Sequence, residues 1–87
     1  MSSPDKFPPE FWSYLQAHPE ERVAAIVRVQ ALSPEVAQAA VEAGCRIQRK
    51  LHLLPSLAVE APGRALMTLA HHPLVVRIEP DRNVRAF

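Results

Sequence analysis

Four histidines and one cysteine are the side chains of this sequence best suited to metal binding or nucleophilic chemistry. A zinc site needs three or four such ligands at spacings that bring them together. His18 lies near the N-terminus and His52 in a much later segment. The pair His71 and His72 precedes a proline, and no carboxylate stands at ligand spacing. Cys45 is a single cysteine, which excludes an internal disulfide and any Cys-x-x-Cys motif. The pattern therefore favours solvated histidines and predicts no metal or other cofactor.

The sequence also lacks the residue patterns that are typical of enzyme active sites and of nucleotide-binding sites. No serine stands in a glycine-flanked nucleophile turn, and no buried carboxylate pair is indicated by spacing. Gly44 and Gly63 are the two glycines, too few for a dinucleotide fingerprint or a P-loop. Ten basic residues against nine acidic ones give a net charge of +1, without the excess that phosphate binding requires. We therefore expect a protein that is not an enzyme and does not bind nucleic acid.

The 87 residues suffice for one domain, and 48% apolar residues give it a small core. No apolar run reaches the length of a membrane span, and residues 1–9 lack the apolar stretch of a secretory signal. We expect a cytoplasmic protein with no membrane contact. Residues 1–20 hold four of the five aromatic side chains and form a separate appendage, with a short helix over Glu10–His18.

The rest of the sequence predicts strands and helices that alternate. Ser33 and the proline after it are typical of a helix start, and Gly44 is typical of a helix end. The predicted elements are a strand over 23–29, a helix over 33–43, strands over 46–53 and 57–61, a helix over 64–71 and a strand over 74–79. This order predicts an α+β fold of the ferredoxin-like βαββαβ type. Such a fold has a four-stranded antiparallel sheet with two helices on one face. The predicted divisions are the appendage over 1–20, the domain over 21–81 and a C-terminal tail over 82–87.

Two of these strands carry specific expectations. The run over 23–29 is apolar except for Arg28 and predicts a strand buried on both sides. The run over 46–53 alternates, with Ile47, Arg49, Leu51 and Leu53 expected on one side, where Arg49 is the misfit. The helices cover one face of the sheet, so the other face is expected to be open to a partner.

The C-terminal third of the sequence carries the most specific pattern. An apolar helix ending in Leu69 is followed by His72 and a proline, then by Val75, an acidic Glu79-x-Asp81 pair and a short tail. This arrangement resembles the propeptide of subtilisin-type serine proteases and the free-standing inhibitors built on that propeptide. The resemblance covers about residues 22–87.

The resemblance implies a protein that inhibits a subtilisin-like serine protease and also assists its folding. It implies that the open sheet face lies on two surface helices of the protease. Glu79 and Asp81 match the family's carboxylates that meet the N-termini of those helices, where free N–H groups favour an anion. We expect both carboxylates to face outward at the end of an edge strand.

The resemblance also implies that the tail enters the active-site cleft of the protease as a product does. The residues that would fill its four non-prime subsites are Val84, Arg85, Ala86 and Phe87. Phe87 would occupy the primary specificity pocket, with no scissile bond after it. The free protein is expected to be a monomer.

Two alternatives remain open at this stage. The first is a ferredoxin-like interaction or dimerisation module with no protease target, whose open face meets a second copy or another protein. The second concerns the N-terminal helix, which either caps the domain or grips the partner, because Phe11 and Leu15 need burial somewhere.

Overall fold

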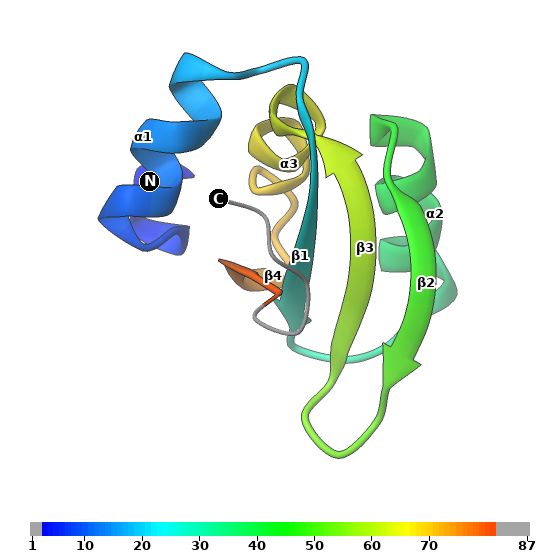
Figure 1. The fold of residues 1–87 in the computed structure, drawn as a ribbon. Helices are drawn as coiled ribbons and strands as arrows, with labels where there is room; N and C mark the ends of the chain where they lie inside the picture. The colour runs from blue at the N-terminus through cyan, green and yellow to red at the C-terminus, as the bar shows by residue number, and fades with distance from the viewer. Residues whose placement is uncertain (1–2, 82–87) are drawn as a thin grey trace.

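The computed structural model describes residues 3–81 and has an α+β fold (Figure 1). The elements of this part of the chain are η1 (Ser3–Lys6), α1 (Pro9–Ala17), β1 (Arg22–Val29), α2 (Pro34–Ala43), β2 (Arg46–Leu51), β3 (Ser56–Pro62), α3 (Gly63–Leu69) and β4 (Val75–Pro80). The four strands form one sheet in the order β2-β3-β1-β4, and each neighbouring pair is antiparallel. The predicted sequence of elements is thus confirmed within a few residues at each boundary.

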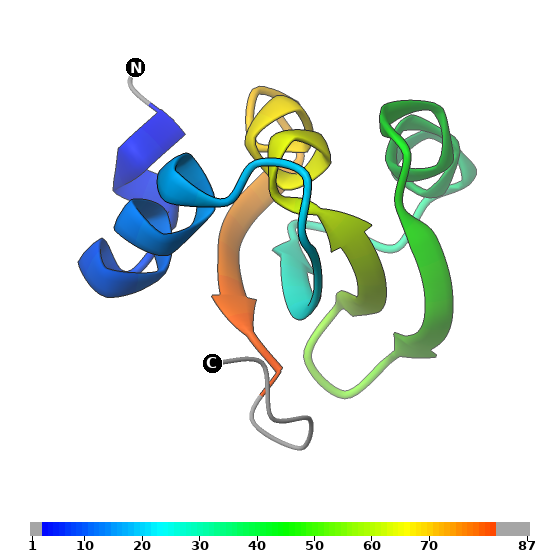
Figure 2. The ribbon, with the colours of Figure 1, turned by 45° about the horizontal axis from the view of Figure 1, so that its top comes forward.

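Helices α2 and α3 lie over the same face of the sheet, and α1 lies to the side, near α3 and β4 (Figure 2). Side chains of β1 alternate between this helix-covered face and the opposite one. Val23, Ala25, Val27 and Val29 are buried, whereas the residues between them are partly exposed. The expectation of a strand buried on both sides was wrong. Ala24 and Ile26 are apolar but lie on the uncovered face, so the alternation between buried and exposed positions is not visible in the residue types.

Strand β2 also differs from its expected pattern. The register with β3 shifts between Ile47 and Arg49, which is the signature of a β-bulge. Ile47 is opposite the buried Val59, but Arg49 is opposite Ala58, on the other face. The bulge therefore removes the misfit, because Arg49 no longer shares a face with Ile47. The strand ends at Leu51 and does not extend to residue 53.

Local signals set the ends of α2 as expected. The Ser33 hydroxyl accepts a hydrogen bond from the backbone N–H of Val36 at 3.3 Å, and Gly44 ends the helix with φ at 110°. Val36 and Ala40 are buried against the sheet. Val41 points away from the core and is exposed. In the described part of the chain, no helix has the length and apolar character needed to cross a membrane.

The N-terminal appendage is part of the hydrophobic core. Phe7, Phe11 and Leu15 are buried in the same cluster as the strand residues. The Lys6 ammonium donates hydrogen bonds to the backbone oxygens of Ala70 at 2.7 Å and of residue 72 at 3.2 Å. A side chain added at Gly63, where α3 begins, would approach backbone oxygens of this appendage at 3.1 and 3.2 Å. Of the two alternatives for this helix, the burial supports capping of the domain.

If the helix is a cap, its apolar side chains must contribute to stability. We expect Phe11→Ala to lower the free energy of unfolding by about 3–5 kcal/mol, because the side chain leaves a cavity in the core. Urea unfolding followed by circular dichroism measures this change. The control is Gln16→Ala on the exposed side of the same helix, which should stay within about 0.5 kcal/mol of wild type. Equal stability of the two variants would contradict the capping role.

Candidate functional site

One face of the sheet carries none of the helices of residues 3–81 (Figure 2). The strand register and the alternation of side chains decide which residues it presents. They are Arg22, Ala24, Ile26 and Arg28 of β1, Arg46, Arg49 and Leu51 of β2, Ser56, Ala58 and Glu60 of β3, and Arg77 and Glu79 of β4. We call this surface the open face. It is charged at its margins, and the side chains along its centre are small or aliphatic, of which Ser56 and Ala58 are buried.

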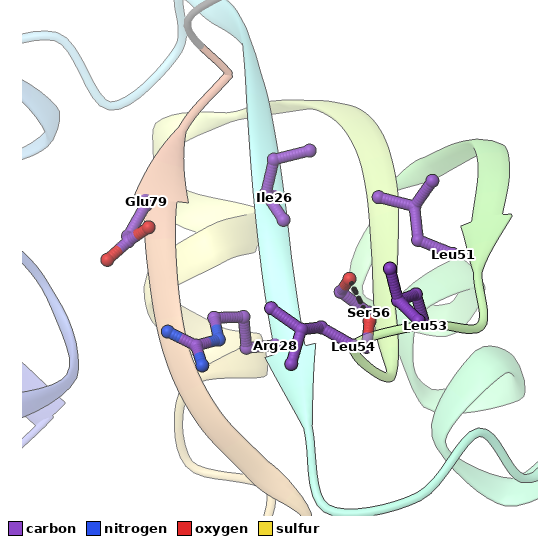
Figure 3. A pocket seen from close by; sticks show the side chains of 7 residues that line it. All are labelled: Ile26, Arg28, Leu51, Leu53, Leu54, Ser56 and Glu79. Atoms are coloured by element: carbon purple, nitrogen blue, oxygen red, sulfur yellow. Dashed lines mark hydrogen bonds between the residues drawn. The ribbon is translucent and has the colours of Figure 1, made fainter.

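The open face is hollowed beside the hairpin of residues 52–55 that joins β2 to β3. The cavity has a volume of about 360 Å³ and is lined by Ile26, Arg28, Leu51, Leu53, Leu54, Ser56 and Glu79 (Figure 3). We call it the hairpin hollow. Leu53 is 98% exposed and Leu54 is 60% exposed, which is unusual for neighbouring leucines. The Ser56 hydroxyl donates a hydrogen bond to the backbone oxygen of Leu54 at 2.7 Å and so holds the hairpin in place.

The charged side chains of the open face are paired in part. The ion pairs are Arg77 with Glu79 at 2.8 Å, Arg22 with Glu60 at 3.8 Å and Arg49 with Asp81 at 4.0 Å. Within the described residues, Arg28 and Arg46 have no ion pair. Arg28 is the more buried of the two and stands directly opposite Arg77. Like charges at opposing positions of neighbouring strands repel one another.

The two carboxylates expected to meet a partner differ in their surroundings. The Glu79 side chain is 40% exposed on the open face, where it accepts a hydrogen bond from Arg77. The Asp81 side chain is only 6% exposed, so the expectation that both face outward holds for Glu79 alone. The backbone N–H of Asp81 donates to the backbone oxygen of Ala24 at 3.0 Å. This bond ties the end of β4 to β1 and keeps Asp81 against the sheet.

The proposed subsite residues Val84, Arg85, Ala86 and Phe87 lie outside the described residues. Strand β4, which precedes them, is an edge strand and ends at Pro80. Asp81, directly after this strand, is therefore the last residue of the expected site that the structure describes.

The residues with metal-binding or nucleophilic potential are dispersed. His18 stacks on Tyr14 at the end of α1, with 4.4 Å between the ring centroids. His72 Nδ1 accepts a hydrogen bond from the backbone N–H of residue 74 at 3.1 Å, and its Nε2 is 4.0 Å from a carboxylate oxygen of Glu35. In residues 3–81, no three of the histidine, cysteine and acidic side chains are grouped so as to hold a metal ion.

Sequence reasoning missed the hairpin hollow. It placed Leu53 in a strand and gave no role to Leu54. The available signal was two consecutive leucines followed by a proline between two predicted strands, since a hairpin loop is ordinarily polar. The second missed feature is Arg28, which was interpreted only as the single charge in a buried strand.

The different environments of the two carboxylates predict different effects on stability. We expect Asp81→Ala to lower the free energy of unfolding by about 1–3 kcal/mol, because it removes a buried acceptor and its contact with Arg49. Glu79→Gln should change it by less than about 0.5 kcal/mol, since its pair with Arg77 is exposed to water. Urea denaturation of both variants measures the difference. Equal losses would contradict the burial of Asp81.

The only cysteine is predicted to react slowly in the folded protein. Burial raises the pKa of the Cys45 thiol to about 11, an effect that the charge of Arg22 partly opposes. The thiolate is the reactive form. At about pH 8 a disulfide reagent should therefore label the native thiol roughly a hundredfold more slowly than the urea-unfolded one. The native rate should keep rising with pH towards 11. A fast native reaction at neutral pH would show an accessible thiolate.

Comparison with known proteins assigns the chain to no family. No family model matches the sequence, and no curated protein sequence matches it. The candidate site is therefore described from its own parts. These are the open face, the hairpin hollow and the acidic end of β4, by which we mean Glu79 and Asp81.

Proposed function

We propose that this protein inhibits a subtilisin-type serine protease, and assists its folding, by laying the open face on the enzyme. The observation that carries the proposal is a sheet face that none of the helices of residues 3–81 covers, and whose edge strand, β4, leads towards the C-terminal residues. A partner that binds this face would also come within reach of the tail, residues 82–87. The protein acts in this proposal as a binding protein and not as a catalyst.

The proposal includes a finer description of the fold, the ferredoxin-like βαββαβ arrangement. The order β2-β3-β1-β4 and the position of α2 and α3 on one face support it. In this arrangement the two central strands are covered by helices on one side only. The uncovered side is then a preformed surface, which binds without a large ordering cost.

Glu79 is the acidic residue best placed to contact the partner. Its carboxylate is partly exposed on the open face near the end of β4. Carboxylates are stabilised at helix N-termini by unpaired N–H groups and by the helix dipole. A surface helix of the protease that begins near β4 would offer such groups. Asp81 would contribute to this contact only by leaving its position against Arg49.

The tail supplies the inhibitory contact in this proposal. Val84 and Phe87 offer apolar side chains to the outer and the primary subsites, with Arg85 and Ala86 between them. Because the docked domain anchors these residues, the tail binds the cleft without the entropic cost of a free peptide. The complex then resembles an enzyme with its product bound.

Truncation of the tail tests this proposal directly. Deletion of residues 85–87 should weaken inhibition of a subtilisin-type protease by roughly a hundredfold or more, because the subsite contacts are lost. Inhibition constants from progress curves measure the effect, and circular dichroism should be unchanged. Val41→Ala on the exposed side of α2 is the control and should inhibit as wild type does. A chymotrypsin-type protease serves as the specificity comparison.

Two results would contradict the proposal. The first is equal potency of the truncated and complete proteins, which would show that the tail takes no part. The second is a wild-type protein that inhibits no subtilisin-type protease and sediments as a dimer. That result would favour the alternative of a dimerisation module, for which the exposed Leu53 and Leu54 are the supporting observation.

A further inference from the structure

We propose that the open face selects a protease surface on which a carboxylate stands beside a large apolar side chain. The carboxylate would bind Arg28, and the apolar side chain would fill the hairpin hollow. This inference rests on the proposed function and specifies the chemistry of the target surface. It is independent of the tail, whereas Glu79 is one of the residues that line the hollow.

The first observation is that the positive charge of Arg28 is not compensated by a neighbouring carboxylate in the described part of the chain. Its guanidinium has no ion pair among residues 3–81 and is partly buried on the open face. The opposing side chain across the strand pair is Arg77, a like charge. Glu79, the nearest acid along β4, is already bound to Arg77 at 2.8 Å. A carboxylate brought by a partner would therefore gain an Arg that residues 3–81 leave uncompensated.

The second observation is that the apolar hollow begins beside Arg28. Figure 3 shows Ile26 from β1, Leu51 from the end of β2 and Leu54 from the hairpin around one space, with Leu54 reaching towards Arg28. The volume of about 360 Å³ accommodates a leucine-sized or larger side chain. Burial of the exposed leucines would remove apolar surface from water. One side chain of the partner would thus be held by contacts on several sides.

The charge of the whole face argues for an acidic partner and against a second copy. The open face carries five arginines against two glutamates, and Asp81 adds one more carboxylate beside Arg49. Two copies face to face would therefore bring two positively charged surfaces together. An acidic surface would instead be attracted, which increases the association rate as well as the affinity.

Charge variants of Arg28 test the inference. The probe is the subtilisin-type protease that the wild-type protein inhibits most strongly, assayed at low and at high salt. We expect Arg28→Glu to weaken inhibition roughly tenfold to a hundredfold at low salt, and Arg28→Gln to weaken it less. Both effects should shrink at high salt, because screening weakens the wild-type contact. The melting temperature should not fall with Arg28→Glu, since the introduced carboxylate would stand opposite Arg77 and replace a like charge with an opposite one.

Matched variants separate this contact from a general effect of charge. Arg46→Gln removes the other arginine without an ion pair, on the same face of the described sheet but away from the hollow, and should change inhibition by less than about threefold. Leu54→Ser should weaken inhibition at both salt concentrations, because the apolar contact is not screened. The two classes of variant therefore differ in their salt dependence.

Three outcomes would overturn the inference. If the wild type inhibits a protease and Arg28→Glu inhibits it equally well, the inference alone is wrong and the proposed function stands. If Arg46→Gln and Arg28→Gln have the same effect, the face acts through its total charge and not through Arg28. If no subtilisin-type protease binds the wild type, the inference and the proposed function fail together.

Discussion

The pairing of β1 with β3 is the constraint on which the rest of the structure depends. It joins residues 22–28 to residues 56–62 in the centre of the sheet and fixes which side chain of each strand faces the helices. Val27 meets Leu57 on the covered face, and Ile26 meets Ala58 on the open one. A shift by one residue would exchange the two sets, placing valines in water and Arg28 in the core. The core and the open face are therefore specified by the same register.

The open face reflects two competing requirements, the burial of apolar side chains for stability and an uncovered surface for a partner. A sheet gains stability by burying both faces, but only one is covered by α2 and α3. Ala58 is buried, and the small side chain of Ala24 limits the apolar area left on the other face. Larger apolar groups are confined to the hairpin end, where Leu53 and Leu54 border the hollow. The appendage compensates for the missing layer, since Phe11 and Leu15 enlarge the core from the side.

The order of the elements was predictable because its signals are local. Ser33 and Gly44 act within one turn of their own backbone, and prolines interrupt the chain between elements. The face of the sheet on which each side chain lies was less predictable, because it depends on pairing with strands distant in sequence. The bulge near Arg49 arises from pairing with β3, and the burial of Asp81 arises from contacts with β1 and β2. The hollow needs β1, β2, β3, β4 and the hairpin in place before its lining residues come together.

The contacts of the first strand also determine when the domain can form during synthesis. Strand β1 pairs only with β3 and β4 within the described sheet, and their residues follow it by roughly 30 to 60 positions. Lys6 at the start of the described chain bonds residues 70 and 72. Until β3 has emerged, a nascent chain can form α1 and α2 but cannot pair β1, and β1 lacks its second partner until β4 follows. The valines of β1 and the aromatic side chains that precede it therefore stay uncovered until β3, α3 and β4 have been synthesised.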